Sequence, residues 1–134
     1  MSHPDGLPDL FLDRSLGGIK VPGLLREAGL RLITLSEHYG IPADEDVADE
    51  EWLELAGTSG WVVFMKDARI RYNTAEREAV ERFSVQCFCL SNQSLNGQAM
   101  AARLLAHLDA ITEACLESGP FIYAVHQQRI ERLL

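Results

Sequence analysis

The feature that most constrains this chain is one uninterrupted apolar run, Trp61-Val62-Val63-Phe64-Met65, which directly follows Gly60. A strand with one face in solvent alternates apolar and polar residues, whereas a strand covered on both faces is apolar throughout. Strands of the second kind occupy the centre of parallel sheets that lie between two layers of helices. The run therefore predicts a central, parallel strand of an α/β protein.

Short apolar stretches and helical patterns alternate along the rest of the chain. The expected strands are 9–13, 30–35, 61–65, 84–90 and 121–125, and the expected helices are 22–28, 49–57, 74–83 and 96–115, with a polar loop over 36–42. This order predicts a three-layer α/β/α fold with a mainly parallel central sheet. We expect a flexible N-terminus over residues 1–8 and a single domain over residues 9–134, because neither a linker nor an internal repeat interrupts the pattern.

Composition excludes several classes of protein. A chain of 134 residues with 47% hydrophobic residues can bury the core of one domain. Twenty acidic against twelve basic residues give a net charge of −8, which argues against a uniformly cationic nucleic-acid sleeve but not against an enzyme that meets nucleic acid through metal ions. The sequence contains neither an apolar run long enough for a membrane span nor a signal-peptide pattern, so we expect a cytoplasmic protein with no membrane partner.

Three aspartates fall near one edge of the expected sheet. Asp13 ends the first strand, Asp67 follows the apolar run, and Asp49 opens the helix that leads into that run. Ligands of open α/β sheets bind outside the carboxyl ends of the strands. Carboxylates that converge there repel one another unless a hard cation such as Mg²⁺ or Mn²⁺ binds between them. The pattern favours a divalent metal site, although each residue also has a structural interpretation: a turn for Asp13, a helix N-terminus for Asp49 and a cap for Asp67.

Several motifs occur in an order that resembles a known family. They are Phe11-Leu12-Asp13-Arg14, Leu25-Arg26-Glu27-Ala28-Gly29, Glu37-His38-Tyr39-Gly40, Asp49-Glu50-Glu51-Trp52-Leu53-Glu54-Leu55-Ala56, Gly60-Trp61-Val62-Val63-Phe64-Met65-Lys66-Asp67 and Gly119-Pro120-Phe121. In this order they resemble PIN-like domains, and specifically the branch of VapC-type toxins from bacterial toxin–antitoxin pairs. The resemblance extends from about Asp9 to the last expected strand.

The resemblance implies an endoribonuclease that depends on Mg²⁺ or Mn²⁺. By position in the family pattern, Asp13, Asp49 and Asp67 would be catalytic acids that bind the metal, and Glu37 would be a fourth catalytic acid. Two such ions can activate a water and stabilise the leaving oxygen in phosphodiester cleavage. The resemblance also implies an RNA substrate and a cognate antitoxin protein as partner, and it leaves a homodimer open.

Basic residues near these acids have two interpretations. Lys66, Arg69 and Arg71 surround Asp67 in sequence, and Arg14 follows Asp13. They could contact the RNA backbone at the mouth of the site, or they could form ion pairs with neighbouring acids. The residues alone do not decide between the two.

Two other functions remain as alternatives to a nuclease. One is a catalytically weak or silent PIN-like module that acts through protein binding. It is favoured by the negative charge and by Met65, which stands where many PIN-like relatives have a hydroxyl residue. The other is a receiver-like signalling domain, which requires a pair of adjacent acids after its first strand. Asp13 is followed by Arg14, so that pair is absent from the sequence.

Overall fold

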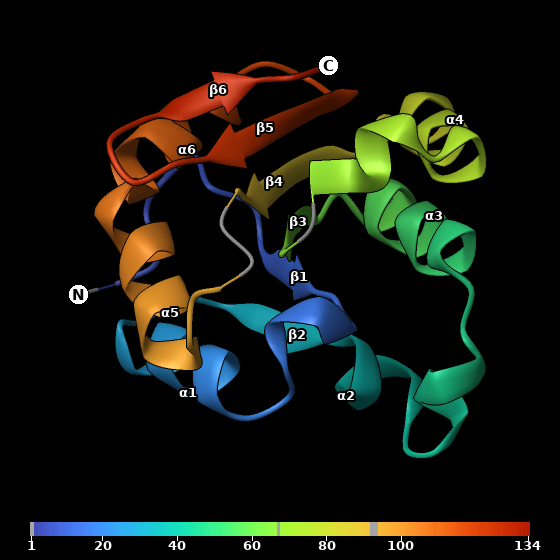
Figure 1. Cartoon of the computed structure of the whole chain (residues 1–134), viewed down its shortest axis with the longest axis horizontal. Coiled ribbons are helices and arrows are strands. Elements are labelled where there is room, and N and C mark those ends of the chain that lie inside the picture. The colour runs from blue at the N-terminus through green and yellow to red at the C-terminus, as the bar shows by residue number, and fades with distance from the viewer. Residues whose placement is uncertain (1, 67, 92–93) are drawn as a thin grey trace.

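A six-stranded sheet lies between two layers of helices in the computed structural model of the chain, which describes residues 2–66, 68–91 and 94–134 (Figure 1). The strand order is β2-β1-β3-β4-β5-β6, and only the β5–β6 pair is antiparallel within these described ranges. The strands are β1 (Leu10–Leu12), β2 (Leu32–Thr34), β3 (Val62–Met65), β4 (Gln86–Leu90), β5 (Phe121–Val125) and β6 (Ile130–Arg132). The mainly parallel α/β/α prediction is confirmed.

Each helical layer covers the side chains of one face of the sheet. The helices α1 (Lys20–Glu27), α5 (Gly97–Ala106) and α6 (Leu108–Ala114) cover one face, and α3 (Asp49–Ser59) and α4 (Thr74–Arg82) cover the other (Figure 1). Strand β3 supplies Val62 and Phe64 to the first core and Val63 and Met65 to the second, and all four are buried. The uninterrupted apolar run is therefore explained by burial on both faces.

The strands β1 and β3 are neighbours, and their ends place the candidate site. They pair in parallel with Leu12 opposite Phe64, so the residues that follow them meet at one edge of the sheet. The helix α3 returns the chain to β3 through Gly60, whose φ of 73° is a left-handed C-cap conformation that favours glycine. On α3, Trp52 and Ala56 are buried against β1 and β3, as its apolar spacing predicts.

The prediction of a polar loop over 36–42 was wrong. Residues Leu35–Tyr39 form the short helix α2, and Ala43–Asp46 form the 3-10 turn η2. A capping box begins α2: the Thr34 hydroxyl accepts a hydrogen bond from the Glu37 amide at 3.2 Å, and the Glu37 carboxylate accepts one from the Thr34 amide at 2.9 Å. This reciprocal pair satisfies two amides at the helix start. It gives Glu37 a structural task that the apolar pattern did not reveal.

The long helix expected over 96–115 was also wrong, because it is broken at His107. This residue has φ −107° and ψ 15°, outside helical geometry, and separates α5 from α6. Its ring nitrogen Nε2 lies 3.0 Å from the carbonyl oxygen of Gln127, in the connection between β5 and β6. The three-to-four residue spacing of apolar residues continues across the break, which is why the sequence pattern did not show it.

Within the segment 1–8, for which a flexible N-terminus is predicted, His3 contacts the rest of the fold. His3 is 8% exposed, and its Nδ1 accepts a hydrogen bond of 2.9 Å from the backbone amide of Arg31, next to β2. Its Nε2 lies 2.8 Å from the carbonyl oxygen of Leu7. In the described part of the chain, no helix is long and apolar enough to cross a membrane.

Candidate functional site

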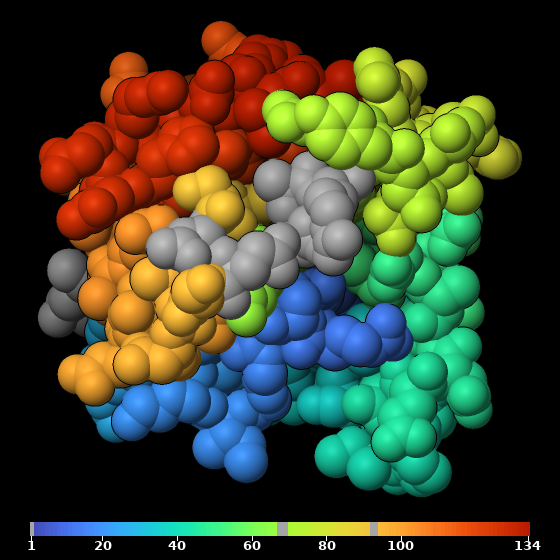
Figure 2. All heavy atoms as spheres, viewed as in Figure 1, coloured from blue at the N-terminus to red at the C-terminus, as the bar shows by residue number. Residues whose placement is uncertain are grey.

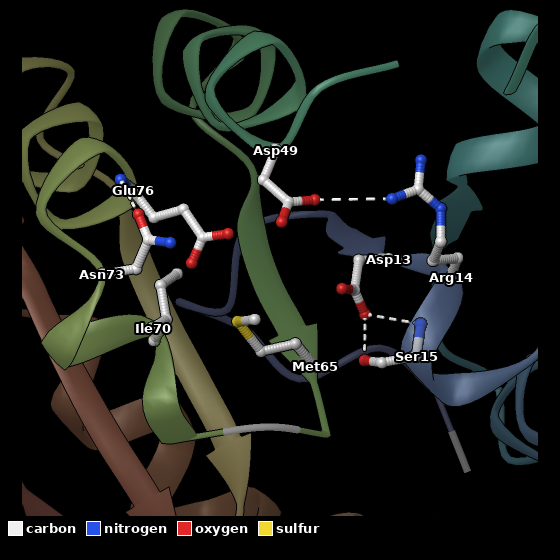
Figure 3. Close-up of a pocket in the computed structure, with 8 residues that line it drawn as sticks. All are labelled: Asp13, Arg14, Ser15, Asp49, Met65, Ile70, Asn73 and Glu76. Carbon is white, nitrogen blue, oxygen red and sulfur yellow. Dashed lines mark hydrogen bonds and ion pairs between the residues drawn. The ribbon is translucent and has the colours of Figure 1, made fainter. Parts of the chain in front are cut away.

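A pocket of about 490 Å³ opens at the edge of the sheet where β1 and β3 end (Figure 3). The chain segments that meet there are the 3-10 turn η1 (Arg14–Leu16), the start of α3, the end of β3, the 3-10 turn η3 (Ala68–Tyr72) and the start of α4. Its lining residues are Asp13, Arg14, Ser15, Asp49, Met65, Ile70, Asn73 and Glu76. Among the described residues that line this pocket, acids therefore outnumber bases by three to one.

Asp13 is the most buried acid of the pocket, with an exposed fraction of 7%. Its Oδ1 caps the turn η1, where it accepts hydrogen bonds from the Ser15 amide at 3.1 Å and from the Ser15 hydroxyl. The Ser15 hydroxyl oxygen in turn accepts a hydrogen bond of 2.9 Å from the Lys66 amide at the end of β3. Burial raises the pKa of Asp13 to about 6, although the Ser15 hydrogen bonds act in the opposite direction. Asp13 thus caps a turn and also lines the pocket.

Asp49 enters the pocket from the first turn of α3. Its Oδ1 accepts a hydrogen bond of 2.9 Å from the Trp52 indole and lies 3.5 Å from Nη1 of Arg14. The same guanidinium donates 3.0 Å hydrogen bonds to the carbonyl oxygens of Asp44 and Val47. The N-cap of α3 is Ala48, so Asp49 is not the capping residue, although an acid in the first turn is favoured by the helix dipole.

Glu76 is a third acid in this pocket, and the sequence interpretation did not include it. Asn73 caps α4 by accepting a 3.0 Å hydrogen bond from the Glu76 amide, which leaves the Glu76 side chain in the pocket beside Asp49 (Figure 3). Burial, hydrogen bonding to Asp49 and the negative charges of Asp49, Glu50 and Asp13 raise the pKa of Glu76 to about 8. The carboxyl group of Asp49 is thus close enough to Glu76 for its negative charge to oppose the ionisation of Glu76.

The fold topology, and not a sequence motif, could have indicated that Glu76 belongs to the pocket. In a parallel α/β sheet, the helix that follows a strand begins near the carboxyl edge of that strand. An acid in the first turn of that helix therefore lies close to acids at the strand ends. The sequence Asn73-Thr74-Ala75-Glu76 is also an ordinary helix start, so by itself it indicates only a cap.

The structure brings together some of the predicted site residues and separates others. Asp13, Asp49 and Arg14 line one pocket, whereas Asp67 lies outside the described residues. Glu37 does not line this pocket: its carboxylate accepts a 2.7 Å hydrogen bond from Arg26 and caps α2, and the hydrogen bond to Arg26 is the main cause of its lowered pKa.

The predicted RNA-contacting residues lie around the end of β3. Lys66 follows β3 directly, and its backbone amide is bound by Ser15. Arg71 lies in η3 with its guanidinium carbon 4.5 Å from the centre of the Tyr72 ring. The side chain of Arg69 is outside the described part of the structure.

The donor atoms of this pocket suit a hard divalent cation. Asp13, Asp49 and Glu76 offer carboxylate oxygens, which Mg²⁺ and Mn²⁺ prefer as ligands. Their mutual repulsion, visible in the raised pKa of Glu76, would be relieved by a positive ion. Within residues 2–66, 68–91 and 94–134, no three His, Cys, Asp or Glu side chains are arranged to hold an ion without some adjustment. The chemistry of the acids therefore fits a cation, and the described side chains alone do not complete its ligand set.

The raised pKa values predict how stability depends on pH. Asp13 and Glu76 hold protons more tightly in the folded protein than at their ordinary pKa values of 3.8 and 4.5. Stability should therefore fall as pH rises from these values through about 6 for Asp13 and about 8 for Glu76. Urea denaturation in EDTA should give a lower free energy of unfolding at pH 8 than at pH 5. Glu76→Gln should reduce this difference, and a free energy that stays constant or rises with pH would contradict the assignment.

Comparisons with known proteins agree with the resemblance seen in the sequence. A family model described as "PIN like domain" matches residues 8–92, a range that contains every residue lining the pocket. The chain is also similar to a protein of Mycobacterium tuberculosis named "Putative ribonuclease VapC45". The two are 44% identical over 128 residues, which cover 96% of this chain and 93% of that protein. No solved structure gives a significant match.

Proposed function

The chain belongs to the PIN-like domain family, in its VapC group, and from this premise we propose that it is a metal-dependent endoribonuclease and the toxin of a toxin–antitoxin pair. The observation that carries the proposal is the convergence of Asp13, Asp49 and Glu76 on one pocket at the carboxyl ends of β1 and β3. Carboxylates at this edge of a parallel sheet are more easily explained by a ligand than by folding, because burial and, to a smaller extent, the neighbouring negative charges raise the pKa values of Asp13 and Glu76.

Mg²⁺ or Mn²⁺ is the proposed cofactor. Asp13 and Asp49 would hold it, with Glu76 beside them and with Asp67, which directly follows Lys66, as the further carboxylate that the family pattern implies. When bound, a divalent ion supplies Lewis-acid activation of water and neutralises charge on the phosphodiester. Other side chains of the pocket would orient the acidic residues and hold the RNA strand.

Ser15 and Trp52 fix the acids before substrate arrives. The two hydrogen bonds of Ser15 hold one oxygen of Asp13 and tie it to the end of β3, and the indole of Trp52 holds one oxygen of Asp49. Donors aimed at a ligating carboxylate restrict its orientation, as outer-shell partners do in metal sites. Ser15 also places a hydroxyl at the end of β3, next to the position where Met65 lacks one.

Arg14 is the positively charged residue among those that line the pocket, and it is the proposed contact to the RNA backbone. It is half exposed and bridges Asp49 to two backbone carbonyls, so its position is fixed while part of the guanidinium faces solvent. Arginine commonly orients phosphate groups in this way. We also propose a cognate antitoxin protein as partner, since the relative that covers nearly the whole chain carries the VapC name.

Incubation of the purified protein with single-stranded RNA tests the function. We expect cleavage with Mn²⁺ or Mg²⁺ and no cleavage with EDTA, because the proposed site contains acids that need a cation between them. Denaturing gel electrophoresis of end-labelled RNA would measure the products. Equal cleavage with and without chelator would contradict metal-dependent chemistry, and binding without cleavage in any metal would favour the silent PIN-like module.

A further inference from the structure

We propose that Tyr72 stacks against a base of the single-stranded RNA whose phosphate enters the acid pocket, with Arg71 contacting the adjacent backbone. The inference rests on the proposed ribonuclease function and adds a residue that selects unpaired RNA. It arises from the segment that connects β3 to α4, whose side chains line the acid pocket on one side and a second hollow on the other.

The segment from η3 to the first turns of α4 separates two hollows on the surface. One side faces the acid pocket and carries Ile70, Asn73 and Glu76. The other side lines a second hollow of about 440 Å³ with Arg71, Tyr72, Thr74, Arg77, Glu78 and Glu81. The two sets alternate along one short stretch of chain. An RNA strand that leaves the acid pocket across this segment would therefore reach Tyr72. Figure 2 shows the yellow-green atoms of this segment at the surface of the molecule.

Tyr72 is unusually exposed for an aromatic residue. Its exposed fraction is 71%, and the other large hydrophobic side chains found exposed in the described structure are aliphatic and lie on other segments: Ile19, Ile41 and Leu116. The Arg71 guanidinium lies over the Tyr72 ring at 4.5 Å, so the ring is oriented by its neighbour and retains a large solvent-facing area. Exposed aromatic rings beside arginine are the usual platforms for unpaired bases, because every base offers a face for stacking.

Among the described residues, Arg71 forms no ion pair. A hydrogen bond from His126 lowers the pKa of Glu131, and the charge of Arg71 adds a smaller contribution in the same direction. The buried Nε of Arg71 lacks a hydrogen-bond partner among the described residues, whereas Arg77 in the same hollow is bound to Glu81 at 3.0 Å. A stack between arginine and tyrosine at the surface contributes little to folding. Phosphate is a ligand that the guanidinium charge of Arg71 would attract. The acid pocket beside it repels phosphate in the absence of a cation, so a positive contact next to the pocket would hold the strand.

The test compares binding of two RNA strands by the full chain. The background variant is Asp13→Asn, which removes a proposed metal ligand and should slow cleavage during the measurement by roughly a hundredfold or more. Fluorescence anisotropy with a short labelled single strand in Mn²⁺ should show binding weakened by roughly fivefold or more in Tyr72→Ala, as expected for loss of one base stack. Tyr72→Phe should bind like the background variant, because it keeps the ring. Ile41→Ala, which truncates an exposed aliphatic residue away from both hollows, should also bind normally.

A fully abasic strand of the same length separates stacking from other effects. Since it keeps the phosphates and lacks the bases, Tyr72→Ala should not weaken its binding, whereas Arg71→Ala should weaken binding of both strands. Equal losses on both strands for Tyr72→Ala, or no loss on either, would overturn the stacking role. Tyr72→Leu, which preserves apolar bulk, provides the same comparison if the alanine variant is poorly folded.

The outcome also distinguishes this inference from the function on which it rests. A parent protein that cleaves RNA with Mn²⁺, together with a Tyr72→Ala variant of unchanged KM, would overturn only the role of Tyr72. A parent that neither binds nor cleaves RNA would overturn the proposed function together with the stacking role.

Discussion

Replacement of Asp13 or Asp49 by asparagine should lower the rate of RNA cleavage by roughly a hundredfold or more. Asparagine keeps the shape of the side chain and its ability to accept a hydrogen bond, so the Ser15 cap and the Trp52 contact can persist. The negative charge that would hold the cation is lost. The measurement is the initial rate of cleavage of a fluorescent RNA at saturating Mn²⁺, with the folded state of each variant checked by circular dichroism.

Asp46→Asn is the matched control for these two variants. Asp46 lies in η2, is exposed and does not line the acid pocket, so its replacement removes the same charge at a distance from the site. It should leave the rate within about twofold, since exposed charges are screened at physiological salt. Cleavage by Asp13→Asn at the parent rate would remove the acid pocket from the mechanism.

Mn²⁺ should raise the melting temperature of the parent protein strongly. A ligand that binds only the folded state stabilises it by about 2.7 kcal/mol at a hundredfold excess over its Kd. Asp49→Asn and Asp67→Asn should lose most of this shift, and Glu76→Gln should lose part of it because Glu76 lies beside Asp49. Glu78→Gln on the same helix is the control, since Glu78 is exposed and lines a different hollow.

The same titration tests the structural interpretation of the acids. If Asp49 only stabilises the start of α3, its replacement should cost about 1 kcal/mol or less whether or not Mn²⁺ is present. If it belongs to a cation site, the metal-free variant should be as stable as the parent or more so, because a repulsive charge has been removed. A parent whose melting temperature does not respond to Mn²⁺ or Mg²⁺ would argue against the cofactor.

The hydrophobic pattern predicted those parts of the fold that are determined mainly by the burial of apolar side chains. Residues 62–65 of the apolar run form β3, in which every side chain is buried, and Trp52, Leu53 and Ala56 form the buried face of α3, as their spacing predicts. In a parallel sheet the carboxyl ends of the strands share one edge, so the convergence of Asp13 and Asp49 there could be anticipated from the sequence. The neighbouring positions of β1 and β3 were not predicted, because right-handed connections alone do not determine the order of the strands.

Other parts depend on polar contacts between distant segments, which hydrophobic periodicity does not encode. The break at His107 coincides with a contact to Gln127, and the strand β6 depends on antiparallel pairing with β5 after a tight connection. Glu37 and Glu76 show the difficulty most directly. Both occupy the third position of a capped helix, yet one is bound by Arg26 and the other lies in the acid pocket. Only the placement of the two helices on the sheet separates their environments.

The pocket is assembled from chain segments that are made at different times during synthesis. Asp13 leaves the ribosome early, Asp49 follows after β2, and Glu76 arrives only with α4, after β3 has been made. Because β3 must pair beside β1 before these side chains can meet, an incomplete chain that ends within α3 lacks the pocket. For a nuclease that could harm the cell producing it, this order delays the active arrangement until more than half of the protein has been translated.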